Sequence, residues 1–171
     1  MIWILNIILV LLIAVMSAYL IRHYIFTLTA LYYRHGQPRF IPSRSYQPTV
    51  SILIPAHDEE KVIGRLLQRT VEFTYPKEKL EIIVIDDASI DQTSKILEKF
   101  AREHEQIKVI HRMTGEGGKG KSVVLNEGLK HMKGEIILCF DADYYPQRDI
   151  VEKLVAYFVD PKVGAVQGRV T

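Results

Sequence analysis

Two aspartates that lie one residue apart, Asp141 and Asp143, directly follow the apolar run Ile136–Phe140. A short apolar run bounded by polar residues predicts a strand that is buried on both faces. In open α/β sheets, ligands bind just beyond the carboxyl ends of such strands. Two neighbouring carboxylates there favour a hard divalent cation, Mn²⁺ or Mg²⁺, that is shared with substrate phosphates. Taken alone, the pair is equally well explained by aspartates that cap a helix or a turn.

Two further predicted strands also end in polar side chains. The run Val50–Ile54 precedes the polar segment 56–59, and the run Leu80–Ile85 precedes Asp86 and Asp87. Because the carboxyl ends of parallel strands lie on one edge of a sheet, these side chains are expected to lie close together. Helix caps account for one acid in each turn, whereas these three turns hold at least five. The pattern therefore predicts a binding site for a cation or a hydroxyl-rich ligand at this edge.

The glycine-rich segment Gly115–Ser122 suggests a rival function. It satisfies the pattern G-x-x-x-x-G-K-[ST], in which a loop cradles the phosphates of a nucleotide. The chain would then be a membrane-anchored P-loop nucleotidase, with Asp141 holding Mg²⁺. Two observations count against it: residues 111–114 separate the preceding strand from the first glycine, and the other two acidic turns stay unexplained. In either case Lys119 and Lys121 can neutralise a diphosphate.

The elements that must position these residues follow a regular strand–helix alternation from Thr49 onward. This alternation predicts an α/β domain with a doubly wound, mostly parallel sheet. Helices are expected between the strands, the third of them ended by Gly134. Five strands are expected, at Val50–Ile54 (closed by Pro55), Leu80–Ile85, Ile107–Ile110, Ile136–Phe140 and Val163–Val170.

The N-terminus is different in kind, because Ile2–Ile21 is almost entirely apolar. About twenty residues at about 1.5 Å each span the core of a bilayer, which predicts a single transmembrane helix. A secretory signal peptide is the alternative, weakened by the absence of Lys and Arg before the run. We expect residues 1–34 to form the helix and its cytosolic flank, 35–48 a linker, and 49–171 the globular domain.

Charge and cysteine content indicate where the globular domain lies. No basic residue precedes the apolar run, and four follow it: Arg22, Arg34, Arg39 and Arg44. This asymmetry predicts a single-pass protein of the cell (inner or plasma) membrane with a cytoplasmic domain. The lone cysteine, Cys139, is expected to be a small buried hydrophobe. One cysteine excludes a disulfide framework and fits a reducing compartment. A net charge of +2 gives no indication of nucleic-acid binding.

Four segments in this order resemble the family 2 glycosyltransferases, which use nucleotide-sugars and have the A-type glycosyltransferase fold. These segments are 52–60, 84–91, 120–129 and 141–143. His57 and Asp58 depart from the usual Tyr and Asn of the first segment. The resemblance implies that Asp143 ligates Mn²⁺ or Mg²⁺ and that Asp141 holds the metal or the donor's ribose. It implies nucleotide-sugar contacts from Pro55, Ala56, His57, Glu59, Asp86, Asp87, Lys121 and Asp141.

The resemblance also implies an inverting transfer of the sugar to a polysaccharide or lipid-linked acceptor at the membrane. The family's acceptor half, with its general-base carboxylate, has no counterpart in this sequence, and Gln167-Gly168-Arg169 is not its Gln-x-x-Arg-Trp segment. We therefore expect the chain to be truncated after the donor-binding half, with the catalytic base unknown. A non-catalytic remnant or an assembly subunit is the remaining alternative.

Overall fold

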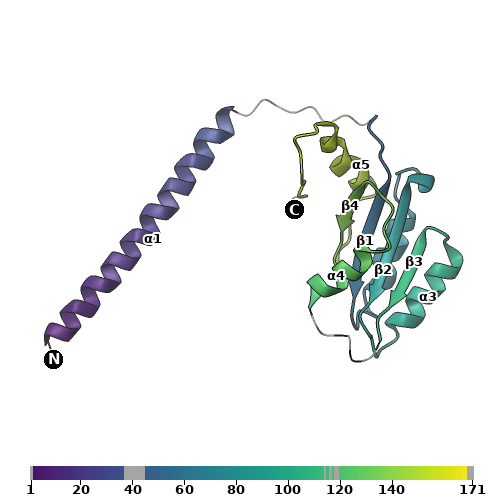
Figure 1. The fold of residues 1–171 in the computed structure, drawn as a ribbon, viewed down its shortest axis with the longest axis horizontal. Coiled ribbons are helices and arrows are strands. Elements are labelled where there is room, and N and C mark those ends of the chain that lie inside the picture. Colours follow the sequence, from purple (N-terminus) through teal and green to yellow (C-terminus); the bar gives the residue numbers. More distant parts are fainter. Residues whose placement is uncertain (1, 37–44, 114, 116, 118–119, 169–171) are drawn as a thin grey trace. The chain divides into compact units, whose positions relative to one another are not determined.

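The chain forms two separate units, residues 1–40 and 41–171 (Figure 1). The computed structural model describes residues 2–36, 45–113, 115, 117 and 120–168, with only the backbone of 34–36. The first unit is one helix, α1 (Ile2–Gly36), in which every described side chain is exposed. By length and composition it is able to cross a membrane, although a signal sequence would meet the same criteria. Its 35 residues extend about 52 Å, so the helix continues beyond the predicted span.

The second unit is built on a parallel sheet of four strands in the order β3-β2-β1-β4 (Figure 1). The strands are β1 (Val50–Ala56), β2 (Leu80–Asp86), β3 (Ile107–His111) and β4 (Ile136–Cys139). The chain moves outward from β1 to β3 and then returns to the other side of β1. The direction of winding therefore reverses between β1 and β4, where α/β sheets bind their ligands.

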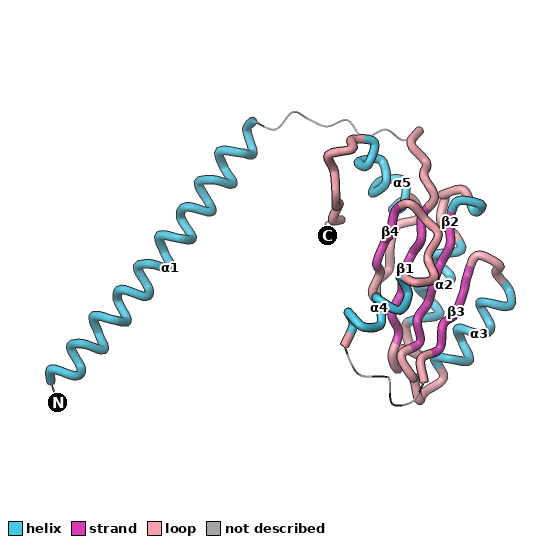
Figure 2. The backbone as a smooth tube through the Cα atoms, viewed as in Figure 1, coloured by secondary structure: helices cyan, strands magenta, loops and turns pink. Residues whose placement is uncertain are grey.

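Helices cover both faces of this sheet, which confirms the predicted doubly wound architecture (Figure 2). Ile52 of β1 belongs to the larger core, packed with residues of α2 (Ile63–Val71), α3 (Thr93–Glu103) and α5 (Ile150–Val155). The next residue, Leu53, points to the opposite face and packs with Val124 of α4 (Lys121–Leu129). Short 3₁₀ helices at Lys77–Lys79 and Ala156–Val159 complete the described elements.

The structure corrects three expectations about the strands. Pro55 does not close the first strand, since β1 continues through it to Ala56. The last expected strand is not formed over residues 163–168, which have no regular secondary structure. β4, the strand before the two aspartates, was expected to be buried on both faces but is buried on one only. Ile137 and Cys139 are exposed, because α4 packs on β1 and β2 and does not cover β4. Cys139 is therefore not the buried hydrophobe that the apolar run suggested.

Gly134 has a different role from the predicted helix end, because α4 already ends at Leu129. It lies against the backbone of β1, where its N–H donates to Ser51 Oγ at 2.8 Å. A Cβ atom at this position would lie 2.4 Å from Ser51 N and 2.7 Å from Val50 C. The glycine thus permits a close approach that aligns β4 with β1.

Substitution of Gly134 by alanine tests this close approach. We expect Gly134→Ala to lower the free energy of unfolding by about 3 kcal/mol, because the clash is with backbone atoms that cannot move aside. Gly164→Ala is the matched control, since a Cβ there meets no atom within 4 Å. Thermal unfolding of the full chain in detergent, followed by circular dichroism, measures both. Equal stability of the two variants would contradict the packing described.

Candidate functional site

A cleft of about 440 Å³ lies at the carboxyl ends of β1, β2 and β4, where the winding reverses. Polar side chains from three strand ends and from the start of α4 surround it. Of the residues predicted to contact the nucleotide-sugar or the metal, the structure brings all but Asp86 together at this cleft. Lys119, predicted beside the diphosphate, lies outside the described residues. The cleft is lined by Pro55, Ala56, His57, Glu59, Asp87, Gly120, Lys121, Val124, Asp141, Ala142 and Asp143.

The turn after β4 presents the two aspartates to the cleft. Phe140 N donates to Leu53 O at 3.0 Å, which continues the pairing with β1 one residue beyond the strand. Ala142 is buried, so the carboxylates on either side of it are exposed. Asp141 forms an ion pair with Lys121, the first residue of α4, whereas Asp143 has no hydrogen bond or ion pair with a described residue.

The described residues contain no cluster of three or more His, Cys, Asp or Glu side chains that could hold a metal by themselves. Two carboxylates on one cleft wall nevertheless fit Mg²⁺ or Mn²⁺, because these ions commonly bind one or two carboxylates and take other oxygens from substrate phosphates. Asp143 lacks a partner among the described residues and Asp141 is paired only with an exposed lysine. The donor set therefore fits a cation that is shared with a bound ligand.

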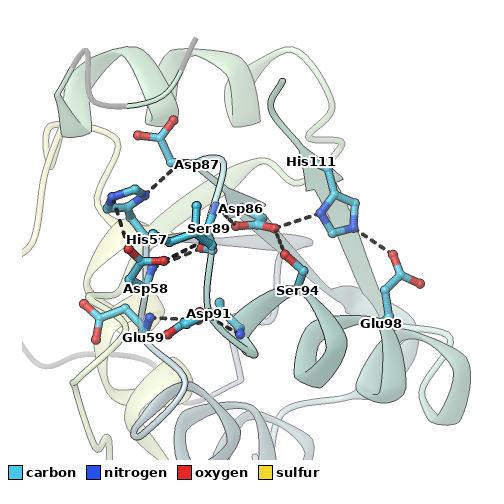
Figure 3. A network of polar contacts seen from close by, with 12 residues as sticks. His57, Asp58, Glu59, Asp86, Asp87, Ser89, Asp91, Ser94, Glu98 and His111 are labelled. Atoms are coloured by element: carbon cyan, nitrogen blue, oxygen red, sulfur yellow. Dashed lines mark hydrogen bonds and ion pairs between the residues drawn. The ribbon is translucent and has the colours of Figure 1, made fainter. Parts of the chain in front are cut away.

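The turns that follow β1 and β2 are held together by reciprocal hydrogen bonds (Figure 3). Asp58 N donates to Ser89 Oγ at 3.1 Å, and Asp58 Oδ1 accepts from Ile90 N at 2.8 Å. Glu59 N donates to Thr93 Oγ1 at 2.8 Å. Asp58 has a left-handed backbone conformation, with φ of 54°, which the two contacts to its neighbouring turn stabilise. The two turns therefore form one rigid rim of the cleft.

His57 and Asp87 connect this rim to the cleft wall. His57 Nδ1 lies 2.8 Å from the Asp87 carbonyl oxygen, and its half-exposed ring lines the cleft. The Asp87 carboxylate forms an ion pair with Arg112, and both side chains are more than nine-tenths buried. Arg112 N also donates to Asp86 O at 2.9 Å. Sequence reasoning missed Arg112; its signal is a basic residue directly after the third strand.

Asp86, predicted to contact the nucleotide, is buried and does not line the cleft; it belongs to a partly buried network that extends to the exposed His111. Its carboxylate accepts hydrogen bonds from Ser89 N at 3.1 Å, from Ser94 Oγ at 2.6 Å and from His111 Nδ1 at 2.9 Å (Figure 3). Burial alone would raise the pKa of Asp86, but the hydrogen bonds from Ser89, Ser94 and His111 outweigh it and hold the pKa below its usual value. The geometry gives Asp86 a supporting place behind the cleft.

The glycine-rich segment is described only in part. Gly117 lies against the turn after β2, where a Cβ atom would come 3.0 Å from Asp87 O. Gly120 has a φ of 94°, in the left-handed region that favours glycine, and directly precedes α4. Lys119, predicted near the phosphates, lies outside the described residues. β3, which precedes this segment, is an edge strand, whereas the cleft lies at the winding reversal between β1 and β4.

Comparison with known proteins identifies the class to which this fold and cleft belong. Residues 51–171 match the sequence profile of Glycosyl transferase family 2. The chain therefore belongs to this family.

Individual relatives agree with this assignment. The chain is 38% identical, over 86% of its length, to a probable glycosyltransferase, YdaM, of Bacillus subtilis. It is also 38% identical, over 71% of its length, to the beta-monoglucosyldiacylglycerol synthase of Synechocystis. It spans 34% of the first relative and 25% of the second.

Solved structures show the same fold. The mannosyltransferase PcManGT of Pyrobaculum calidifontis, in complex with GDP-Man and Mn²⁺, matches 81% of the chain with a TM-score of 0.71 and 32% identity. TarS of Staphylococcus aureus, in complex with UDP-GlcNAc, matches 72% with a TM-score of 0.58 and 33% identity. The chain covers 42% and 36% of these two structures. The predicted A-type glycosyltransferase fold is thereby confirmed.

Substitution of Asp86 by asparagine tests its supporting place. We expect Asp86→Asn to lower the free energy of unfolding by about 3 kcal/mol, because an amide N–H₂ must replace an oxygen that accepts buried hydrogen bonds. Since the pKa of Asp86 is lowered, this loss is complete above the usual aspartate pKa of about 3.9 and shrinks as the pH falls through the folded-state pKa.

The exposed Glu103→Gln serves as control for this experiment, with stability measured by thermal unfolding at pH 7 and at pH 3.5. An Asp86→Asn variant as stable as the control at pH 7 would show that the buried network contributes nothing.

Proposed function

We propose that this chain forms the donor-binding part of a membrane-anchored, inverting glycosyltransferase that binds a nucleotide-diphosphate sugar together with Mn²⁺ or Mg²⁺. The observation that supports it most is the cleft itself, which lies at the winding reversal of the sheet. Asp141, Asp143 and Lys121 line this cleft together with Asp87. PcManGT, a relative by structure, is in complex with GDP-Man and Mn²⁺, and TarS is in complex with UDP-GlcNAc.

In this proposal the metal–diphosphate end of the donor lies at β4 and α4. Asp143 and Asp141 hold the cation, which supplies Lewis-acid stabilisation of the departing nucleoside diphosphate. Lys121 neutralises phosphate oxygens, and Gly120 lets the backbone approach them closely. The ion pair between Lys121 and Asp141 already keeps the ammonium group beside the carboxylates.

The nucleoside end of the donor lies at β1 and β2. Pro55, Ala56 and the His57 ring form one wall, and Glu59 lies at the rim. Asp87 offers a carboxylate that forms an ion pair with the buried Arg112 guanidinium. These residues bind and orient the donor, while deprotonation of the acceptor needs a separate general base.

Family membership favours this function over the P-loop nucleotidase and over a non-catalytic remnant. A glycan or a lipid-linked acceptor at the membrane is supported by α1, which is long and apolar enough to span a bilayer, and by the lipid glycosyltransferases among the relatives. We place the protein in the cell membrane with its globular unit in the cytoplasm, because the basic residues follow the apolar segment.

Calorimetric titration of the full chain with GDP-mannose and UDP-GlcNAc tests donor binding. We expect at least one of these donors to bind with a metal-dependent affinity, and we expect Asp143→Asn to lower that affinity at least tenfold. The physical reason is that the amide removes one charged oxygen ligand from a cation with few protein ligands. Asp160→Asn, on a half-exposed aspartate that does not line the cleft, is the control. Donor binding that is unaffected by EDTA would contradict the metal site.

The same titrations distinguish the two phosphate-binding functions. A glycosyltransferase site predicts that Lys121→Ala and Asp87→Ala both weaken donor binding, because each lines the cleft. A P-loop site predicts ATP or GTP binding that disappears in Lys121→Ala and survives in Asp87→Ala. The second pattern would overturn the proposed function.

The exposed Cys139 is the lone cysteine and provides a native reporter of topology. We expect a membrane-impermeant maleimide to label it in spheroplasts only after detergent is added, because the globular unit is cytoplasmic. Cys139→Ser should abolish the labelling, and intact mass should show that residues 2–36 remain. Labelling of sealed cells would contradict the orientation, and loss of the apolar segment would identify it as a cleaved signal peptide.

A further inference from the structure

His111, the last residue of β3, lies between two carboxylates behind the cleft (Figure 3). Its Nδ1 atom is 2.9 Å from Asp86 Oδ2, and its Nε2 atom is 2.7 Å from Glu98 Oε1 on α3. An ionised carboxylate only accepts hydrogen bonds, whereas a neutral imidazole has a proton on one nitrogen only. Both contacts are therefore satisfied together when His111 is the doubly protonated imidazolium.

The network supports this protonation state. Asp86 is ionised at neutral pH, since its pKa is lowered. Burial by itself would lower the pKa of His111, but the hydrogen bonds and charges of Glu98 and Asp86 outweigh it and raise the pKa above the usual value. β3 is an edge strand, so β2 and α3 are the elements packed on it, and they present Asp86, Glu98 and the hydroxyl of Ser94.

Asp86 transmits this interaction to the cleft. Its second oxygen, Oδ1, accepts the Ser89 N–H at 3.1 Å and so closes the turn that contains Asp87 and Ala88. Ala88 has a left-handed φ of 57°, a strained conformation that persists only where surrounding contacts hold it. The same turn presents the Asp87 carbonyl to His57 and the Asp87 carboxylate to the cleft.

We propose that His111, in its protonated form, is a positioning residue for the nucleotide-sugar, acting through Asp86 on the Asp87 turn without touching the ligand. The identity of the ligand in this proposal rests on the proposed function, whereas the effect of His111 on the order of the Asp87 turn does not. Loss of the proton leaves the buried Asp86 carboxylate without its cationic partner, and the neutral imidazole can donate to only one of the two carboxylates. The Asp86 carboxylate that closes the Asp87 turn is then held less firmly.

The sign of the pH dependence follows from the raised pKa of His111. Its contribution is complete below the ordinary histidine pKa of about 6.5 and is lost as the pH rises through the higher folded-state pKa. Donor affinity should therefore fall as the pH rises above the ordinary histidine pKa. Arg112 stays charged across this range, so its ion pair with Asp87 does not contribute to the change.

Three histidine variants of the full chain, titrated with donor and saturating Mg²⁺ between pH 6 and pH 9, test this dependence. For the wild type we expect affinity to fall about tenfold across the range, the usual effect of one charge-assisted hydrogen bond. His111→Arg, with a permanent cation that can face both carboxylates, should bind well with a flat profile. His111→Gln should bind about tenfold more weakly at pH 6, also with a flat profile. The control His131→Gln, which removes a histidine facing Glu127 on α4, should follow the wild type.

Hydrogen exchange of the Ser89 amide provides a readout without ligand. Its protection factor should fall above the His111 pKa in the wild type and stay constant in His111→Arg. If no donor binds the wild type at any pH, the proposed function fails, and the exchange data still decide the role of His111. A wild-type pH profile retained in His111→Arg, or unchanged protection of Ser89 across the range, would overturn the inference. An NMR titration in which His111 has an ordinary pKa would do the same, even if no variant folds.

Discussion

The architecture depends on how carboxylates crowded at one edge of a parallel sheet are compensated. Parallel strands necessarily end together, so acids that follow β1, β2 and β4 are brought into mutual repulsion. Each is met by a different partner: Asp58 by the backbone N–H of Ile90, Asp86 by His111 and two serines, Asp87 by Arg112, and Asp141 by Lys121. Asp143 has no such partner among the described residues, which makes it the place where an external cation is most favourable.

This compensation divides the acids into two layers. Asp86 is buried and fully engaged, and it stabilises the turn that presents its neighbour. Asp87, Asp141 and Asp143 face the cleft. A rigid inner layer held by directed hydrogen bonds lets the outer layer keep a fixed geometry before any ligand arrives, which reduces the entropic cost of binding. The inner layer thus supports the cleft through the turn it closes, without lining the cleft itself.

The sequence was sufficient for the order and type of the elements from β1 to α5, because apolar runs of strand length alternate with helical periodicity from Thr49 onward. The edge on which the acids gather also followed, since strand ends in a parallel sheet coincide. The different positions of Asp86 and Asp87 could not be predicted. Neighbouring aspartates look equivalent in the sequence, and only the structure shows that Asp87 lines the cleft whereas Asp86 packs behind it. Cys139 and Gly134 were misjudged for a related reason: exposure and close approach depend on which helix covers which strand.

The central claim is that the cleft joins a cation to a diphosphate at the turn after β4. A crystal structure of the full chain with Mn²⁺ and a nucleotide-diphosphate sugar, measured at the manganese absorption edge, tests it most directly. The account predicts one anomalous peak in the cleft, about 2.0–2.6 Å from a carboxylate oxygen of Asp143 and from the diphosphate oxygens. A diphosphate bound at the glycine-rich segment, with manganese remote from Asp143, would contradict it.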